Sequence, residues 1–183
     1  IAQLNLLIDK LGSTTVVSTA NKNYYLGLAH GMRAYYYFQL TRAWGNVVIW
    51  TGIFTDVDLS NLAKAASPAA DVMTLIKSDI DKSVTSYGTD YLFRNTKSYW
   101  SKAATLMLKA EVYLWTSQNG GGAADATIAL NSLTDIQTNI PALALQTNFA
   151  NVFAVTSRGN SEIIFAVRNL NAENSLPFAA TFY

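Results

Sequence analysis

The sequence predicts a mainly α-helical fold in which antiparallel helix pairs pack together and a few short strands lie at the periphery. Apolar residues recur three and four positions apart in most segments, which is the spacing of a helix with one buried face. Glycine, proline and capping residues separate these segments, as expected at helix ends. Only two short runs, 47–50 and 163–167, are β-branched and apolar enough to be strands.

The first two helices are expected at residues 1–11 and 21–44. The first has a stripe of leucine and isoleucine at helical spacing, and Gly12 ends it. The second is long and rich in aromatic residues, and it ends at Gly45 and Asn46. The chain then continues directly into the first predicted strand.

The second helix carries two pairs of residues that call for explanation. Gly27 and Gly31 lie four residues apart, and each disfavours a helix by about 1 kcal/mol relative to alanine. Such a pair more often allows a neighbouring helix to approach closely than it marks a binding site. Arg33 and Arg42 lie on opposite sides of the helix, so they do not form one cationic patch. We expect structural roles for both, with Arg33 paired to a buried carbonyl or carboxylate.

A third and a fourth helix are expected in the middle of the chain. Ser67 followed by Pro68 predicts a helix start, because a capping residue before a proline suits the first helical turn. This helix runs to about residue 86, where Tyr87 and Gly88 end it. Ser98 is the expected cap of the fourth helix, which ends near residue 115.

A fifth helix is expected at 123–138, between a turn made by the glycines 120–122 and Pro141, which cannot continue a helix. A single helical turn is expected at 149–153. Helices two and three, and then four and five, make successive pairs of similar layout. Tetratricopeptide-like proteins bury their helix faces by stacking such pairs. The usual repeat consensus is not met, so this architecture rests on the helix lengths and on the resemblance given below.

Composition limits the class of protein. Half of the 183 residues are hydrophobic, 14% are charged and the formal net charge is +1, so the chain is neither disordered in composition nor basic enough to indicate nucleic-acid binding. Cysteine is absent, which excludes disulfides and thiol chemistry. No apolar run approaches the roughly 20 residues that span a bilayer. We interpret residues 1–183 as a single helical domain and expect it to be an internal fragment of a longer exported protein.

No catalytic residue, metal site or cofactor is predicted. His30 is the one histidine, so a zinc site would need carboxylate ligands, and these show no suitable spacing. A serine–histidine pair is not excluded, although the chain has no G-x-S-x-G motif. Two carboxylate pairs, Asp56 with Asp58 and Asp79 with Asp81, could indicate glycosidase or calcium chemistry. Neither has the spacing of a calcium loop, and we interpret both pairs as solvated surface residues.

Large aromatic residues in or beside loops are the candidates for ligand binding. Sugar rings have apolar CH faces that stack on flat aromatic side chains, and their hydroxyls need polar partners alongside. Loops are also where binding residues concentrate. Each aromatic could equally stabilise a helix end or an interface. The predicted ligand-binding residues are Trp44, Asn46, Trp50, Tyr91, Tyr99 and Trp100, with Asp56, Asp58, Asp90 and Asn95 as further polar partners, whereas Tyr113 and Trp115 are predicted to be core.

Four segments carry motifs that follow one another in the order of a known family. The first reads MRAYYYFQLTRAWGNV, an aromatic helix that leads into an apolar strip. Together the four segments resemble the SusD/RagB family of nutrient-binding outer-membrane lipoproteins. They are residues 32–47, 71–80, 102–114 and 160–167, and the resemblance covers about residues 20–170. Asn46 and Val48 stand where the family has aspartate and proline.

The resemblance implies a non-catalytic receptor on the outer membrane that binds oligosaccharides or other nutrients. It implies a partner, a TonB-dependent transporter of the SusC type, and a lipid anchor that lies outside this segment. Family members are more than twice as long, and other parts of them also contribute loops to the ligand site. Two other classes stay open. One is a tetratricopeptide-like scaffold that binds a peptide or protein, and the other is a glycan-processing enzyme, which would need two carboxylates in one cleft.

Overall fold

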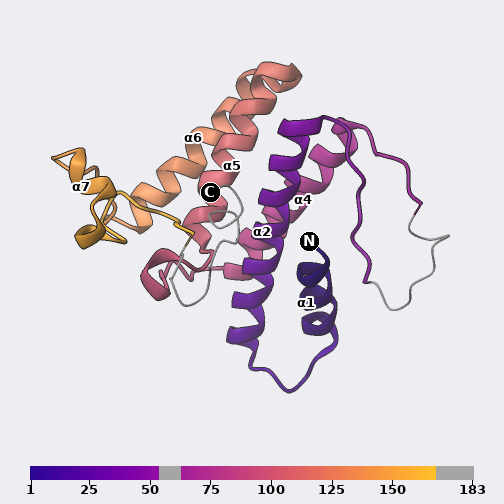
Figure 1. Ribbon diagram of the computed structural model, residues 1–183, viewed down its shortest axis with the longest axis horizontal. Coiled ribbons are helices and arrows are strands. Elements are labelled where there is room, and N and C mark those ends of the chain that lie inside the picture. Colours follow the sequence, from indigo (N-terminus) through magenta and orange to yellow (C-terminus); the bar gives the residue numbers. More distant parts are fainter. Residues whose placement is uncertain (54–62, 168–183) are drawn as a thin grey trace, which may run out of the picture.

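The computed structural model describes residues 1–53 and 63–167, and most of these residues are helical (Figure 1). Two successive helix pairs dominate the described part, as the sequence predicts. The α-helices are α1 (Ala2–Ser13), α2 (Thr19–Trp44), α4 (Ala69–Tyr87), α5 (Lys102–Thr116), α6 (Gly122–Asn139) and the single turn α7 (Ala150–Phe153). Shorter helical turns are η1 (Asn95–Lys97), η2 (Ser117–Gly121) and η3 (Val155–Ser157).

The helices alternate in direction, which confirms the predicted antiparallel pairs. Helix α4 packs back along α2, and α6 packs back along α5 (Figure 1). The N-terminal helix α1 lies alongside α2, on the side away from α5. Helix α5 also contacts α4, so α2, α4 and α5 enclose a common core. Its largest fully buried apolar side chains are Tyr37, Phe38, Val72, Ile76, Ile80 and Val112.

Local capping explains where the long helices begin and end. The hydroxyl of Ser18 accepts a hydrogen bond from the Asn21 backbone N–H (3.4 Å), and Ser101 caps α5 in the same way. Helix α2 ends at Gly45, whose φ of +71° suits glycine better than other residues. The cap of α5 is Ser101, three residues after the predicted cap at Ser98.

The start of α4 corrects two predictions. Its N-cap is Pro68 rather than Ser67, and no side chain of its own caps it. Instead the Asn46 side-chain oxygen accepts a hydrogen bond from the backbone N–H of Ala69 (3.0 Å). Asn46 was predicted as a ligand contact, but its side-chain oxygen caps the next helix. This hydrogen bond joins the residue that follows α2 to the start of α4.

The predicted strands are wrong within the described residues. Residues 47–50 contribute one isolated antiparallel bridge, between Val47 and Ser67. Residues 163–167 form no strand, and within the described residues the Ala166 N–H donates to the Lys97 carbonyl (3.1 Å). Strand propensity needs a neighbouring strand to be realised. Here Ile164 and Phe165 pack on the helical core instead.

Tyr113 is buried as predicted, whereas the prediction for Trp115 is wrong. The Trp115 side chain is 47% exposed and meets the Phe38 ring edge-on, with the ring centroids 6.1 Å apart. It lies in the last turn of α5, where one face of the helix is left uncovered.

Candidate ligand-binding site

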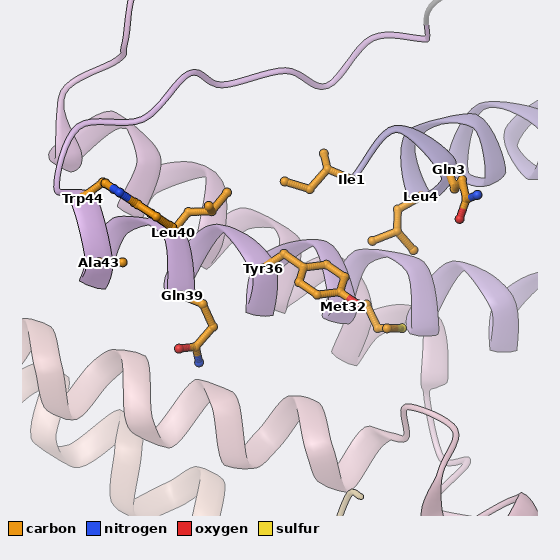
Figure 2. Close-up of a pocket in the computed structure, with 9 residues that line it drawn as sticks. All are labelled: Ile1, Gln3, Leu4, Met32, Tyr36, Gln39, Leu40, Ala43 and Trp44. Carbon is orange, nitrogen blue, oxygen red and sulfur yellow. The ribbon is translucent and has the colours of Figure 1, made fainter. Parts of the chain in front are cut away.

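A groove runs between α1 and the C-terminal half of α2. Met32, Tyr36, Leu40 and Trp44 recur every four residues along α2, so they form one stripe on its surface. Side chains of α1 face this stripe across the groove (Figure 2). The groove has a volume of about 650 Å³ and is lined by Ile1, Gln3, Leu4, Met32, Tyr36, Gln39, Leu40, Ala43 and Trp44.

Trp44 is an exposed part of this groove. Its side chain is 71% exposed at the end of α2, and in Figure 2 the indole points back along the helix toward Leu40. The amides of Gln3 and Gln39 line the same groove. Figure 2 shows Gln3 at the opposite end of the groove from Trp44, so the groove offers a flat apolar face at one end and an amide at the other. The sequence prediction included Trp44 but not Tyr36, which lines the same groove, although their spacing at multiples of four residues is visible in the sequence.

A buried ionic cluster lies on the adjacent side of α2. The Asp79 carboxylate has no solvent exposure. It accepts hydrogen bonds from Arg33 Nε (2.7 Å) and Nη2 (2.8 Å), and it is 2.9 Å from Nδ1 of His30. The predicted buried partner of Arg33 is therefore confirmed. The prediction that Asp79 is a solvated surface residue is wrong, because its helix face is covered by α2, whereas Asp81 is exposed and pairs with Lys109 (2.8 Å).

Burial alone would raise the pKa of the Asp79 carboxyl, but the hydrogen bonds from Arg33 and His30 outweigh it and hold that pKa below its ordinary value. The carboxylate therefore stays charged inside the fold. Its role is structural, because both of its oxygens are already occupied by partners. In the described part of the chain, no group of three or more His, Cys, Asp or Glu residues could hold a metal ion.

The cluster extends to the loop that follows α2. Arg33 Nη1 donates to the Asn5 side-chain oxygen (2.9 Å), and Asn5 Nδ2 donates to the carbonyls of Trp50 (2.9 Å) and Gly52 (3.1 Å). The Tyr37 hydroxyl donates to the same Trp50 carbonyl (2.9 Å) and accepts from the Trp50 N–H (2.7 Å). Side chains of α1 and α2 thus fix the backbone at Trp50. This explains how an irregular loop keeps one position beside the helices.

Two of the predicted residues are committed to contacts within the fold. Trp100 is 3% exposed and donates from its indole N–H to Thr105 Oγ1 (2.8 Å), so it has no face free for a ligand. The hydroxyl of Tyr91 donates to the Asp135 carboxylate (2.6 Å), and Lys102 Nζ lies 3.8 Å from the centre of its ring. Burial and the bond to Asp135 raise the pKa of Tyr91 to about 12.

The six predicted residues do not share one surface. Of them, only Trp44 lines the groove between α1 and α2. Trp50 is half-buried in the anchored loop, with Lys64 Nζ 5.5 Å from the centre of its ring. Tyr99 is 51% exposed beside the start of α5. Asp56 and Asp58 lie outside the described residues.

The sequence and the helical fold were compared with known proteins, and the similar ones are SusD-like proteins. No protein-family model matches the chain. A curated SusD-like protein from Formosa agariphila is 32% identical over 124 residues, which is 64% of this chain and 22% of that protein. The solved structure of NanU from B. fragilis is 50% identical, with a TM-score of 0.85 over 93% of this chain and 33% of that one.

A SusD superfamily protein from Bacteroides vulgatus is also similar, at 41% identity and a TM-score of 0.81 over 92% of this chain and 34% of that one. One from Bacteroides fragilis is 40% identical, with a TM-score of 0.83 over 94% of this chain and 35% of that one. The resemblance predicted from the sequence is therefore confirmed. In sequence and in fold, this chain is similar to SusD superfamily proteins, and it spans about one third of the length of these solved structures.

Proposed function

We propose that this chain is the helical core of a non-catalytic cell-surface protein that binds oligosaccharides or related nutrients. The observation that carries the proposal is the exposed Trp44 indole at the edge of a groove, on a SusD-like arrangement of helices. The fold alone would not be enough, because one scaffold serves many functions. The proposal of a sugar ligand therefore rests on the Trp44 side chain and the groove beside it, and not on the fold by itself.

The groove suits binding rather than bond cleavage. The Trp44 ring offers a flat face for the CH side of one sugar unit, while Gln3, at the opposite end of the groove, offers an amide to the hydroxyls of another unit. Met32 and Leu40 make an apolar floor between them. None of the described residues that line it carries a carboxylate, so this part of the groove lacks the acid and base groups of a glycosidase.

Two comparisons support the wider proposal. A solved structure with this fold, 23% identical and with a TM-score of 0.73, is described as a complex with xylogluco-oligosaccharide, so the fold is compatible with a bound oligosaccharide. The similarity to SusD superfamily proteins supports the proposed partner, a TonB-dependent transporter of the SusC type, and a location on the outer membrane through a lipid anchor. We propose both for the complete protein. In the described part, no helix is both long enough and apolar enough to cross a bilayer.

The test is a glycan-array screen of the complete protein, followed by calorimetric titration of each hit. Trp44→Ala should weaken binding at least about tenfold, or ~1.4 kcal/mol, because it removes the stacking face. Trp115→Ala is the matched control, since this half-exposed indole lies outside the groove. Circular dichroism checks that both variants fold. Equal affinity in the wild type and Trp44→Ala would exclude the groove as the site.

The groove also favours a second candidate function. Its lining is mostly apolar, as expected where an amphipathic helix or peptide docks on a tetratricopeptide-like scaffold. In that case the array would show no glycan. A pull-down would instead recover a protein partner that Trp44→Ala releases and Trp115→Ala retains.

A further inference from the structure

The groove between α1 and α2 is long compared with a single sugar ring. Met32 lies near one end of it and Trp44 lies at the other, 12 residues further along the same helix. At a rise of about 1.5 Å per residue, this separation is ~18 Å along the helix axis. Figure 2 shows Gln3, which belongs to α1, at the end where Met32 lies. A ligand that contacts both Trp44 and Gln3 must therefore be much longer than one sugar unit.

Tyr36 offers a second aromatic ring between these two ends. Its side chain is 40% exposed, and it lies on the same stripe as Trp44, two four-residue steps before it. This spacing corresponds to about 12 Å along the helix axis. A pyranose ring is hardly wider than the six-membered ring of a tyrosine, so one sugar unit cannot stack on both aromatic side chains. The two rings therefore suit different units of one chain.

The shape of the stripe favours an extended ligand. Residues four apart on a helix form a row that is inclined by only about 26° to the helix axis. Leu40 lies in this row between the two aromatic residues, and Met32 continues it beyond Tyr36. Ile1 and Leu4 of α1 line the facing side (Figure 2). A chain of sugar units laid along the row would keep contact over its whole length, whereas a compact sugar would contact only a part of it.

The lining also favours a ligand without charge. None of the described residues that line the groove has a charged side chain. An ionised group placed there would lose part of its hydration without gaining an opposite charge, which is unfavourable. Neutral hydroxyls differ, because the amide of Gln3 can both donate hydrogen bonds to them and accept hydrogen bonds from them.

We propose that the groove binds a neutral, extended oligosaccharide of at least three units. One unit would stack on Trp44, another would lie on Tyr36, and a further one would reach Gln3. This inference rests on the function proposed above and adds the length, shape and charge of the ligand. A disaccharide at Trp44 would leave the Gln3 end empty. It would bind more weakly, because units joined in one chain raise the effective concentration of one another at their separate contacts.

Calorimetry of the complete protein tests the length, with the disaccharide and the tetrasaccharide of the cello-, malto- and xylo-series as ligands. In the series that binds most tightly, we expect the tetrasaccharide to bind at least about tenfold more tightly than the disaccharide. Gln3→Ala should weaken binding of the tetrasaccharide severalfold and leave the disaccharide unchanged, whereas Trp44→Ala should weaken both. Gln137→Ala, at an exposed position on α6, is the matched control and should leave both affinities unchanged.

The outcomes separate this inference from the proposed function. A tetrasaccharide that binds no more tightly than its disaccharide would overturn the proposed length and leave the proposed function standing. A Gln3→Ala variant that weakens both ligands, or neither, would do the same. Tetragalacturonic acid that binds as tightly as the best neutral tetrasaccharide would overturn the proposal of a neutral ligand. If no oligosaccharide of the three series binds the wild type, this inference is overturned, while the array still decides the proposed function.

Discussion

Asp79 shows how much one buried residue can depend on its partners. Two side chains of α2, those of Arg33 and His30, hold its carboxylate in place. The sequence indicated that Arg33 needs a buried partner, because a guanidinium on a helix that packs into the core must be neutralised. It could not identify the partner. Asp79 lies 46 positions away, and only the packing of α4 on α2 brings the two residues together.

The lowered pKa of Asp79 gives a prediction with a definite sign. A carboxyl group whose pKa is depressed by folding adds stability above its unfolded value, ~3.9, and loses it as the pH falls through the folded value. The wild type should therefore lose free energy of unfolding as the pH drops below about 4. Asp79→Asn should lower that free energy by about 3–5 kcal/mol at pH 7, because it leaves a buried guanidinium uncompensated. It should also flatten the acid dependence.

Denaturant titrations at pH 7, 4 and 3 measure this difference. Asp81→Asn, two residues away and exposed, is the control and should behave like the wild type. An Asp79→Asn variant that is as stable as the control at pH 7 would contradict the role assigned to the cluster.

Helices were predicted more accurately than the segments that join them. Local signals determine a helix, namely the spacing of apolar residues and a cap, so α2 and α6 lie within two residues of their predicted ends. The strands at 47–50 and 163–167 failed because strand formation depends on a distant neighbour. The anchoring of the loop at Trp50 was not visible either. Its contacts come from Asn5 and Tyr37, which are far away in the sequence.

That anchoring leads to a prediction about the loop. Asn5→Ala removes the side-chain bonds to Arg33 and to the carbonyls of Trp50 and Gly52. We expect faster hydrogen exchange in residues 47–53 and a loss of about 1–3 kcal/mol in the free energy of unfolding, because buried polar groups lose their partners. Hydrogen exchange measured by mass spectrometry tests the first expectation, and a denaturant titration tests the second. Asn131→Ala, at an exposed position on α6, is the control. Unchanged exchange in 47–53 would mean that Tyr37 alone holds the loop.

Across the whole molecule, the two helix pairs meet where α2 passes the start of α5. The contact is close because Gly31 has no side chain. A Cβ added there would lie 2.8 Å from Thr105 Oγ1 and closer still to the indole nitrogen of Trp100. Gly27 plays the same part against the Tyr87 ring. The sequence interpretation that these glycines allow close helix packing is confirmed.

Gly31→Ala tests this meeting of the two helix pairs. Helix propensity alone would make alanine more stable by about 1 kcal/mol. Crowding against Trp100 and Thr105 should reverse the sign, for a net loss of about 1–3 kcal/mol in the free energy of unfolding. Gly12→Ala is the control, because its added Cβ would meet nothing within 4 Å. The unfolding temperature should fall in Gly31→Ala and rise in Gly12→Ala. A rise in both variants would show that α2 and α5 can move apart without a loss of stability.

The candidate site was predicted less completely than the fold. The helical scaffold could be predicted from a resemblance that covers about residues 20–170. Helix packing requires apolar residues at many regularly spaced positions, so it is visible in the sequence. A ligand site depends on which few side chains remain uncovered, and that was visible for Trp44 but not for Trp100. In the sequence, Trp44 stands at the end of one predicted helix and Trp100 at the start of another. The packing of Tyr35 and Phe165 against Trp100, and its hydrogen bond to Thr105, distinguish the two in the structure.

The position of Asp79 in the sequence also affects the order in which a nascent chain can fold. A ribosome adds about 5–20 residues per second, so Asp79 emerges roughly 2–9 s after Arg33. During that interval α1 and α2 have both been made, but closing them on each other would bury a guanidinium without its counter-ion. A chain that holds α1 and α2 but lacks α4 therefore has no counter-ion for Arg33, so the first two helices do not complete the native cluster by themselves.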